Sequence, residues 1–392
     1  MNSVIVLFLA IEDRRIAPAR LAGSLDSAGI AVAALCLRDS MLGHSRYPFR
    51  LFELPTSRSF RGLAKALEDA VSTSGARWII PGDEQSVALL QFLRLRRNVA
   101  GLSPGSMAVI EASLGNPCFF DACLLKSNTL RLASKLGIKV PRGFTVTSVG
   151  EAVARADDLG FPVFLKESFS WAGLGVVSCP DPISVRQAYI VKAKKRTMLP
   201  IRDLFRSLLG RHWYPTGTSI DIQSPISGQV VMFCGIAARG HLMGGICATQ
   251  LECAYPQGPS TAVRICHEPE IAAAAEKMVV ALGYSGFISF DFIKPEVGGE
   301  PVLIECNARP VPIAHLGARV GVDLGVLLAE YLSTGVLPAK QICSQRTLEI
   351  ILFPASLRPW PGLQGMCRDI PFDDPALIEF QLAMHPDLAL AA

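Results

Sequence analysis

Residues 286–309 read GFISFDFIKPEVGGEPVLIECNAR, and in this stretch three oxygen-bearing side chains, Asp291, Glu305 and Asn307, stand within otherwise apolar runs. The runs flank a Pro/Gly-rich turn, which is the pattern of an antiparallel β-hairpin. Because alternate residues of a strand share a face, Glu305 and Asn307 point to the same side, and the hairpin can turn Asp291 toward it. Carboxylate and amide oxygens grouped in this way suit Mg²⁺.

The same alternation of acidic and apolar residues would also arise on the solvated face of an antiparallel sheet, without any chemistry. Arg309 follows the three residues directly and favours a ligand site, because a planar cation beside a carboxylate pair suits a carboxylate or phosphate. Cys306 is interpreted as a thiol of the core. His315 either orients a substrate or acts as a base, or it is a structural histidine, which is the favoured interpretation.

A second group with chemical potential is Lys166 and the loop after it, SFSWAGLGVV. Lys166 interrupts the apolar strand 161–167, where a lysine is costly unless a negative partner meets it. Gly173 and Gly175 allow the backbone to approach a ligand closely and to expose its N–H groups. A strand lysine followed by a glycine loop therefore indicates a phosphate-binding segment.

The elements that must position these residues begin with a small parallel α/β domain in the first ~110 residues, where apolar strands alternate with helical segments. No Gly-x-Gly-x-x-Gly follows the first strand, so dinucleotide binding is not supported. Pro81, Gly82, Asp83 and Glu84 lie at the carboxyl end of a strand, where open α/β sheets bind ligands. The alternative for Asp83 is that it caps the next helix.

Further along the chain, helical periodicity predicts a helix over 121–136 that contains Lys126. The segment 186–211 is locally basic and has apolar residues at helical spacing. It is interpreted as a solvated amphipathic insert rather than as a site for an anionic partner. Two strands joined by a turn at Arg239-Gly240 follow, and an alanine-rich helix leads into the hairpin.

The composition excludes several classes of protein. The 392 residues are 50% hydrophobic and 18% charged, and the formal charge of +4 comes without a dense basic stripe, so nucleic acid is not an expected partner. The eleven cysteines form no Cys-x-x-Cys pair, which argues against a zinc site or a disulfide framework and favours a reducing, cytoplasmic location. The apolar run at 4–10 is too short to cross a membrane and lacks the flanks of a signal peptide.

Taken in order, these segments resemble the ATP-grasp superfamily over nearly the whole chain. The succession carries the resemblance: an α/β domain, a helix with Lys126, GIKVPRGF, Lys166 with its glycine loop, QSPISG, and the hairpin ending in ECNAR. The resemblance implies an α/β N-terminal domain followed by an α+β ATP-grasp domain whose two subdomains clasp ATP. The implied bounds are 1–112 for the N-terminal domain, 113–220 and 221–335 for the subdomains, and 336–392 for a C-terminal extension.

The resemblance also implies a nucleotide site. Lys126 and Lys166 would hold the α- and β-phosphates, and a loop would close over them through Ala172, Gly173 and Gly175. The hinge that meets adenine would consist of Gln223, Ser224, Pro225 and Ile226. Many members of the family carry a ribose-binding carboxylate after the hinge, and here Gln229 would take its place.

By the same resemblance, Asp291, Glu305 and Asn307 would ligate Mg²⁺, with Mn²⁺ as an alternative ion. Arg309 and Asn307 would face the reacting carboxylate or the transferring phosphate, and Arg264 would add a cation at the γ-phosphate.

The implied reaction activates a small carboxylate as an acyl phosphate, which an amine, with an amino acid among the candidates, then converts to an amide. A biotin-carboxylase-like enzyme that uses bicarbonate and a non-catalytic nucleotide-binding regulatory protein stay open as alternatives. No membrane partner is expected. A homodimer is the commonest assembly of soluble enzymes.

Overall fold

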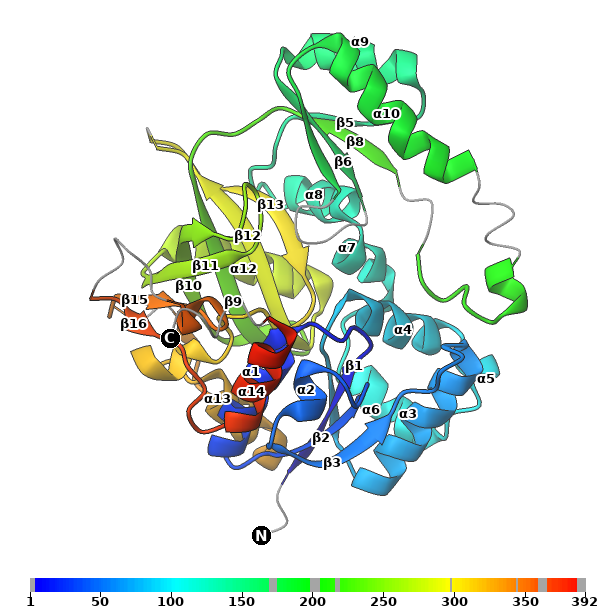
Figure 1. The fold of residues 1–392 in the computed structure, drawn as a ribbon, viewed down its shortest axis with the longest axis vertical. Helices are drawn as coiled ribbons and strands as arrows, with labels where there is room; N and C mark the ends of the chain where they lie inside the picture. The colour runs from blue at the N-terminus through cyan, green and yellow to red at the C-terminus, as the bar shows by residue number, and fades with distance from the viewer. Residues whose placement is uncertain are drawn as a thin grey trace.

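The computed structural model describes residues 4–168, 175–197, 205–215, 219–296, 298–342, 345–358 and 365–385. Figure 1 shows three layers of structure, with the N-terminal domain at the bottom, a large sheet in the middle and a small sheet with two helices at the top. In the described part of the chain, each layer is built around its own β-sheet.

The N-terminal domain contains a parallel four-stranded sheet in the order β3-β2-β1-β4, as the alternating pattern predicted. Its strands are β1 (Ile5–Ala10), β2 (Ala31–Cys36), β3 (Pro48–Glu53) and β4 (Trp78–Pro81). Both faces of β1 are buried, because helices cover the sheet on each side. The helices are α1 (Ile16–Ser27), α2 (Met41–His44), α3 (Phe60–Ser74), α4 (Glu84–Leu95), α5 (Arg97–Ala100) and α6 (Pro104–Ala112).

The small sheet is antiparallel, in the order β5-β8-β6-β7, with bounds β5 (Gly143–Val146), β6 (Val163–Glu167), β7 (Val176–Cys179) and β8 (Ile220–Gln223). Helices α9 (Val149–Leu159) and α10 (Pro182–Thr197) pack on the face that carries Leu165 and Ile222. The opposite face carries Lys166, directly across from Asp221. This second face is therefore the one available to a ligand.

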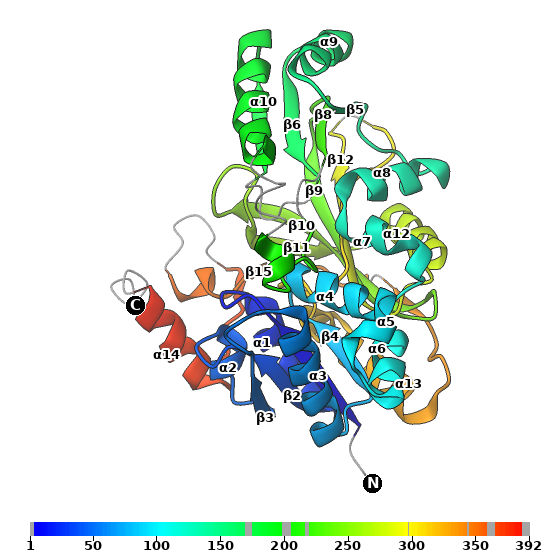
Figure 2. The same ribbon diagram turned by 90° about the vertical axis from the view of Figure 1, so that its right-hand side faces the viewer.

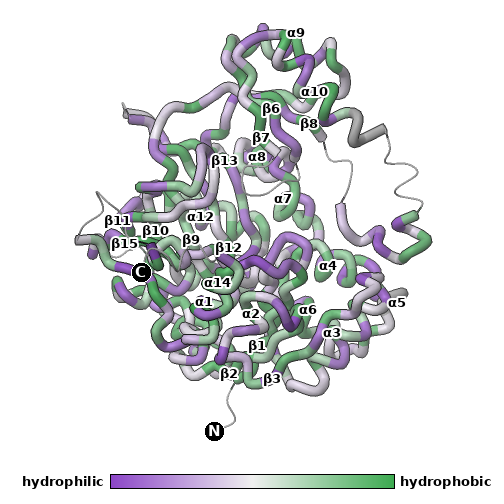
Figure 3. Tube along the Cα trace, viewed as in Figure 1, coloured by the Kyte–Doolittle hydropathy of each residue, from purple (hydrophilic) through white to green (hydrophobic). Residues whose placement is uncertain are grey.

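The large sheet runs in the order β13-β12-β9-β10-β11-β15-β16, with β14 beside β10. Figure 2 shows it between the N-terminal domain and the small sheet, and β9 and β10 are largely hydrophobic in Figure 3. The turn between these strands has positive φ at Arg239 and Gly240, as a tight hairpin requires. The strands are β9 (Gln229–Ala238), β10 (His241–Cys253), β11 (Ser260–Cys266), β12 (Gly286–Lys294), β13 (Val302–Asn307), β14 (Gln341–Ile342), β15 (Leu348–Ile351) and β16 (Cys367–Arg368).

Helices lie on both faces of the large sheet. Helix α12 (Pro269–Leu282) contributes to the core on one face together with Phe233 and Phe290. On the other face, α13 (Leu324–Thr334) and α1 share a core with Ile236 and Ile246, which joins the sheet to the N-terminal domain. The C-terminal helix α14 (Pro375–Met384) packs against α2.

Two sequence expectations need correction. The helix predicted over 121–136 is divided into α7 (Phe120–Leu124) and α8 (Lys126–Lys135). The break falls at Leu125, which is extended, because the next N–H, that of Lys126, donates to the carbonyl of Ser168 at 2.9 Å instead of continuing the helix. The break places Lys126 at the start of α8.

The basic insert is also not fully solvated. Lys192 of α10 is buried, and its Nζ donates to Glu167 Oε1 at 3.0 Å and to the carbonyl of Gly175 at 2.9 Å. Both acceptors flank the predicted phosphate loop. The described residues of the chain contain no helix that is long and apolar enough to cross a membrane.

Candidate active site

The hairpin predicted from residues 286–309 is present as β12 and β13. In its antiparallel register Asp291 lies opposite Glu305, and Ser289 lies opposite Asn307. All three oxygen-bearing side chains therefore share one face, as the strand periodicity predicted. The amide Nδ2 of Asn307 lies 3.5 Å from Asp291 Oδ2.

The two carboxylates of the hairpin repel each other in a buried setting. Burial, and then the charge of Glu305, raise the pKa of Asp291 well above its ordinary value, against the opposing influence of Arg309 and Lys126. Such a pair is stabilised by a bound cation. No group of three or more His, Cys, Asp or Glu gathers among the described residues. Two carboxylates and one amide oxygen nevertheless fit Mg²⁺, which takes few protein ligands and keeps water or phosphate oxygens.

The two lysines singled out in the sequence approach the hairpin from separate elements. Lys126 Nζ lies 3.3 Å from Glu305 Oε1, although Lys126 starts α8 and Glu305 belongs to β13. Burial, and next the charge of Lys126, lower the pKa of Lys166 to about 8, while Glu305 and Asp221 act in the opposite direction. Two neighbouring ammonium groups favour a bound anion, because its negative charge relieves their repulsion.

The segment predicted as a hinge connects the small sheet to the large one. Gln223 ends β8, and its buried side chain has an Oε1 atom without a hydrogen-bond partner among the described residues. The N–H of Ser224 donates to the carbonyl of Arg142 at 2.9 Å, and Pro225 and Ile226 lead on toward β9. A buried acceptor in want of a donor at this junction fits a ligand that carries an N–H group.

Two of the predicted site residues stand apart from this group. Across β9 and β10, the residue of β11 that aligns with Asp291 is Ile265. Its neighbour Arg264 therefore lies on the other face of the large sheet, where it is paired with Glu349. Its Nε donates to Glu349 Oε1 at 2.7 Å. Gln229 is exposed and pairs with Lys294, again on the face that Asp291 does not share. The expected roles of Arg264 and Gln229 are therefore not supported.

The predicted phosphate loop is described only at its end. Ala172 and Gly173 lie outside the described residues. The carbonyl of Gly175 accepts from the N–H of Glu167 at 3.1 Å and from Lys192. The base of the loop is therefore fixed to β6 and α10.

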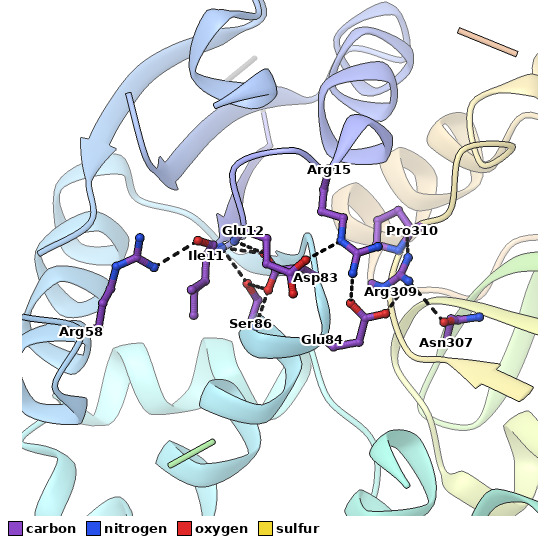
Figure 4. Close-up of polar contacts among 10 residues, drawn as sticks. All are labelled: Ile11, Glu12, Arg15, Arg58, Asp83, Glu84, Ser86, Asn307, Arg309 and Pro310. Atoms are coloured by element: carbon purple, nitrogen blue, oxygen red, sulfur yellow. Dashed lines mark hydrogen bonds and ion pairs between the residues drawn. The ribbon is translucent and has the colours of Figure 1, made fainter. Parts of the chain in front are cut away.

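Arg309 connects the hairpin to the N-terminal domain, a contact that the sequence pattern did not predict. The guanidinium is buried, and its Nη2 donates to Glu84 Oε1 at 2.5 Å and to Asn307 Oδ1 at 3.3 Å. Arg15 contacts the other oxygen of Glu84 at 2.7 Å (Figure 4). The only sequence signal for this contact was the position of Glu84 at the carboxyl end of a strand.

Asp83 is a structural residue, which confirms the capping interpretation. Its carboxylate accepts from the N–H of Ser86, in the first turn of α4, at 2.7 Å. It also accepts from the N–H groups of Ile11 and Glu12 at 2.6 and 2.9 Å. Asp83 thereby holds together the carboxyl ends of β1 and β4. It does so next to Glu84, whose side chain contributes to the site.

His315 and Cys306 also have the structural surroundings that were favoured for them. The imidazole of His315 is buried and its Nε2 lies 3.1 Å from both carboxylate oxygens of Asp369. Burial raises the pKa of the Cys306 thiol well above its ordinary value, so the thiol is not ionised at neutral pH.

A cleft lies where the hairpin, α7 and α8 meet the N-terminal domain. Its lining residues are Glu84, Val87, Cys123, Leu124, Lys126, Glu305, Cys306, Asn307, Ala308 and Arg309. The side-chain oxygens of Glu305 and Asn307 line the cleft, and the cationic groups of Lys126 and Arg309 line it as well. The arrangement suits a metal-bound polyphosphate with a carboxylate held next to it.

Residues 126–199 match the family model of the carbamoyl-phosphate synthase L chain, ATP binding domain. The carbamoyl phosphate synthase large chain of Streptomyces coelicolor is 27% identical over 222 residues, which is 53% of this chain and 19% of that protein. This chain thus matches only about a fifth of that relative's length.

Two solved structures extend the comparison to most of the chain. The biotin carboxylase domain of the Hydrogenobacter thermophilus 2-oxoglutarate carboxylase, in complex with MgADP and bicarbonate, has a TM-score of 0.61 at 16% identity and covers 85% of this chain and 71% of that one. The L-amino acid ligase from Bacillus licheniformis has a TM-score of 0.55 at 14% identity, with 85% and 75% covered. As the order of its motifs predicted, this chain has the fold of the ATP-grasp superfamily.

Proposed function

We propose that this chain is an ATP- and magnesium-dependent ligase that joins a small carboxylate to an amine through an acyl phosphate. The observation that carries the proposal is the convergence of Lys126, Lys166, Asp291 and Glu305, which come from three different parts of the fold. Positive charge for phosphates and oxygen ligands for a metal thereby lie side by side.

The nucleotide would lie between the small sheet and the large sheet. Lys126 and Lys166 would contact its phosphates, and the repulsion between the two ammonium groups would be relieved by that contact. Gln223 Oε1, which has no hydrogen-bond partner among the residues that the structure describes, offers an acceptor for the exocyclic amino group of adenine. The backbone of 224–226 would complete the adenine contacts.

Asp291, Glu305 and the amide oxygen of Asn307 would hold Mg²⁺. When bound, the ion would neutralise part of the negative charge of the phosphates. Asn307 is already oriented, because its Nδ2 faces Asp291 and its Oδ1 accepts from Arg309. This fixed orientation places the amide and the guanidinium next to the two carboxylates.

The reaction follows from what the cleft would hold. A carboxylate oxygen of the acid substrate attacks the γ-phosphorus of ATP, the bond to the bridging oxygen breaks, and ADP leaves. Arg309 holds the attacking carboxylate and balances the charge that develops on the transferred group. The amine nitrogen then attacks the carbonyl carbon, phosphate leaves, and a proton is lost from nitrogen. No enzyme nucleophile is needed, which agrees with the protonated state of Cys306.

The comparisons support the chemistry at the level of the superfamily. One neighbour is an L-amino acid ligase and another is a biotin carboxylase domain solved with MgADP and bicarbonate. Both enzymes fit a site that handles a carboxylate next to a nucleotide. The buried Arg309 beside the proposed metal ligands suits either substrate.

The experiment is a screen of carboxylate and amine pairs with purified protein, ATP and Mg²⁺, read by ADP release and by product mass. We expect ADP release with a pair whose product has the mass of acid plus amine less water. ATP hydrolysis stimulated by bicarbonate alone would establish the carboxylase alternative instead. Tight nucleotide binding without ADP release across the whole panel would establish a regulatory role. Absence of nucleotide binding would overturn all three.

A further inference from the structure

Four charged side chains form a continuous row across the boundary between the N-terminal domain and the hairpin (Figure 4). The row, called here the charge row, consists of Glu12, Arg15, Glu84 and Arg309. Arg15 lies 2.7 Å from Glu12 Oε2 and 2.7 Å from Glu84 Oε2, and Arg309 lies 2.5 Å from Glu84 Oε1. Positive and negative groups alternate, so the inner members, Arg15 and Glu84, are satisfied by their neighbours.

The two ends of the charge row each have a buried atom without a hydrogen-bond partner among the described residues. At one end it is the acceptor Glu12 Oε1, and at the other it is the donor Arg309 Nε. Arg309 is only 8% exposed. An unsatisfied buried polar group is costly, and these two are of opposite kind. A ligand with a carboxylate at one end and a hydrogen-bond donor at the other would satisfy both.

Residues 205–215, called here the strap, contact the loop before α3. The N–H of Phe60 donates to the carbonyl of Gly210 at 2.7 Å. Arg211 Nε donates to the carbonyl of Ser57 at 2.8 Å, and the indole of Trp213 donates to the carbonyl of Arg58 at 3.1 Å. These contacts fix the strap to the domain that supplies Glu12 and Glu84.

The strap brings Tyr214 to the acidic members of the charge row. Burial, followed by the charges of Glu12, Glu84 and Asp83, raises the pKa of the Tyr214 phenol. The phenol is therefore a neutral group lying among carboxylates. The preceding residue, Trp213, is only 6% exposed, which anchors this end of the strap in the core.

We propose that the charge row and the strap form the pocket for the acid substrate, and that this substrate carries an amino group remote from its carboxylate. The carboxylate faces Arg309 beside the metal ligands, and the ammonium faces Glu12 beneath the strap. Because Arg15 and Glu84 separate the two ends, several bonds lie between the two charges of the ligand. Glu12 thereby determines the specificity for an acid substrate that carries a remote amino group. The inference rests on the proposed function, since the Arg309 end is assigned as the reacting one.

The test measures binding of a homologous series of ω-amino carboxylates, the matching unsubstituted carboxylates and α-amino acids, with and without Mg²⁺ and a non-hydrolysable ATP analogue. We expect the longer ω-amino carboxylates to bind about tenfold or more tightly than both other classes, because a charged hydrogen bond is gained at Glu12. Glu12→Gln should remove this preference. Glu330→Gln, which changes an exposed residue of α13, is the matched control and should retain it.

A preference of the unmodified protein for the unsubstituted carboxylates, or a preference that persists in Glu12→Gln, would overturn the inference. Trp213→Phe, which removes the indole donor of the strap, should weaken the amino carboxylate without changing affinity for the ATP analogue. Analogue binding is recorded separately for every variant. Selective amino carboxylate binding without any nucleotide binding would support the pocket while rejecting the proposed ligase.

Discussion

Lys126 Nζ lies 3.3 Å from Glu305 Oε1, so a proposed phosphate-binding lysine and a proposed metal ligand form an ion pair with each other. The pair is mostly buried, with side-chain exposures of 13% and 25%. Removing one partner of such a pair leaves the other charge without compensation. Mg²⁺ and ATP together supply a new partner for each residue, which predicts that metal and nucleotide bind cooperatively.

The first expectation concerns the metal ligand. Glu305→Gln keeps the shape of the side chain but removes the charge that Mg²⁺ needs. We expect kcat for ADP release to fall by about 10²–10³, as when one group that stabilises the transition state is lost. Isothermal titration should also show that Mg²⁺ no longer increases affinity for the nucleotide.

Glu300→Gln is the matched control for this experiment. Glu300 lies just before the same strand of the hairpin, but its side chain is 72% exposed and contacts Lys139 at the surface. Its replacement should leave both kcat and the magnesium effect within twofold, because exposed ion pairs contribute little. A Glu305→Gln variant as active as this control would reject the metal assignment.

The second expectation is a pH dependence set by Lys166. Burial and the nearby Lys126 lower the pKa of Lys166 to about 8 in the free protein. Bound phosphates favour the protonated lysine, so its pKa is higher in the complex. At a pH between these two pKa values, Lys166 must take up a proton when ATP binds. The affinity for ATP should therefore fall up to about tenfold for each pH unit above 8.

Lys166→Arg tests this origin of the pH dependence. An arginine stays charged over the whole range, so affinity measured by titration between pH 7 and pH 9.5 should become nearly independent of pH. The overall affinity can differ, since the guanidinium is larger, and only the slope is informative. An unchanged slope in the variant would assign the titration to another group.

The hairpin and the shared face of its three oxygen-bearing side chains could be predicted from sequence because every feature is local. The apolar alternation, the Pro/Gly turn and the two-residue spacing of Glu305 and Asn307 all lie within one stretch, and a strand has a fixed period of two. The contact between Arg309 and Glu84 is different, since 225 positions separate the two residues. Only the packing of the N-terminal domain against the large sheet brings them together.

Arg264 and Gln229 show a second limit of prediction from the sequence. Each is on a strand as expected, but the face that a strand residue occupies depends on its register with the neighbouring strands. The pairing of β10 with β11 contains irregularities between Gln250 and Cys253. Such shifts leave no clear signal in the sequence, and an error of one residue moves a side chain to the opposite face. The division of the predicted helix at Leu125 likewise depends on a distant acceptor, Ser168.

The third expectation concerns acid stability of the C-terminal extension. Burial alone would raise the pKa of Asp369, but the hydrogen bonds and charges of His315 and Arg20 outweigh it and hold this pKa well below its ordinary value. Burial lowers the pKa of His315, so at neutral pH Arg20 supplies the positive charge, at 2.5 Å. A carboxyl with a lowered pKa stabilises the fold above about pH 4, and this contribution is lost as the pH falls further.

Asp369→Asn should therefore lower the free energy of unfolding by about 3–5 kcal/mol at pH 7, because Arg20 is left buried without its partner. The difference from the unmodified protein should narrow at pH 4 and below. Denaturant titrations at several pH values provide the measurement, with Glu379→Gln at an exposed position of α14 as the control. A difference that stays constant with pH would show that Asp369 acts through packing alone.

The last expectation separates the two arginines that the sequence assigned to catalysis. Arg264 is on the far face of the large sheet, and its ion pair with Glu349 is about half exposed, at 47% and 42%. Arg264→Ala should therefore change the free energy of unfolding by less than about 1 kcal/mol and leave kcat and the ATP affinity almost unchanged. Arg309 is buried beside Asn307 and Glu84, so Arg309→Lys, which keeps the charge but loses the planar set of donors, should lower kcat strongly. Parallel steady-state assays and denaturant titrations of the two variants give the comparison. A large loss of kcat in Arg264→Ala, with stability intact, would mean that β11 changes its position when nucleotide binds and that Arg264 reaches the phosphates after all.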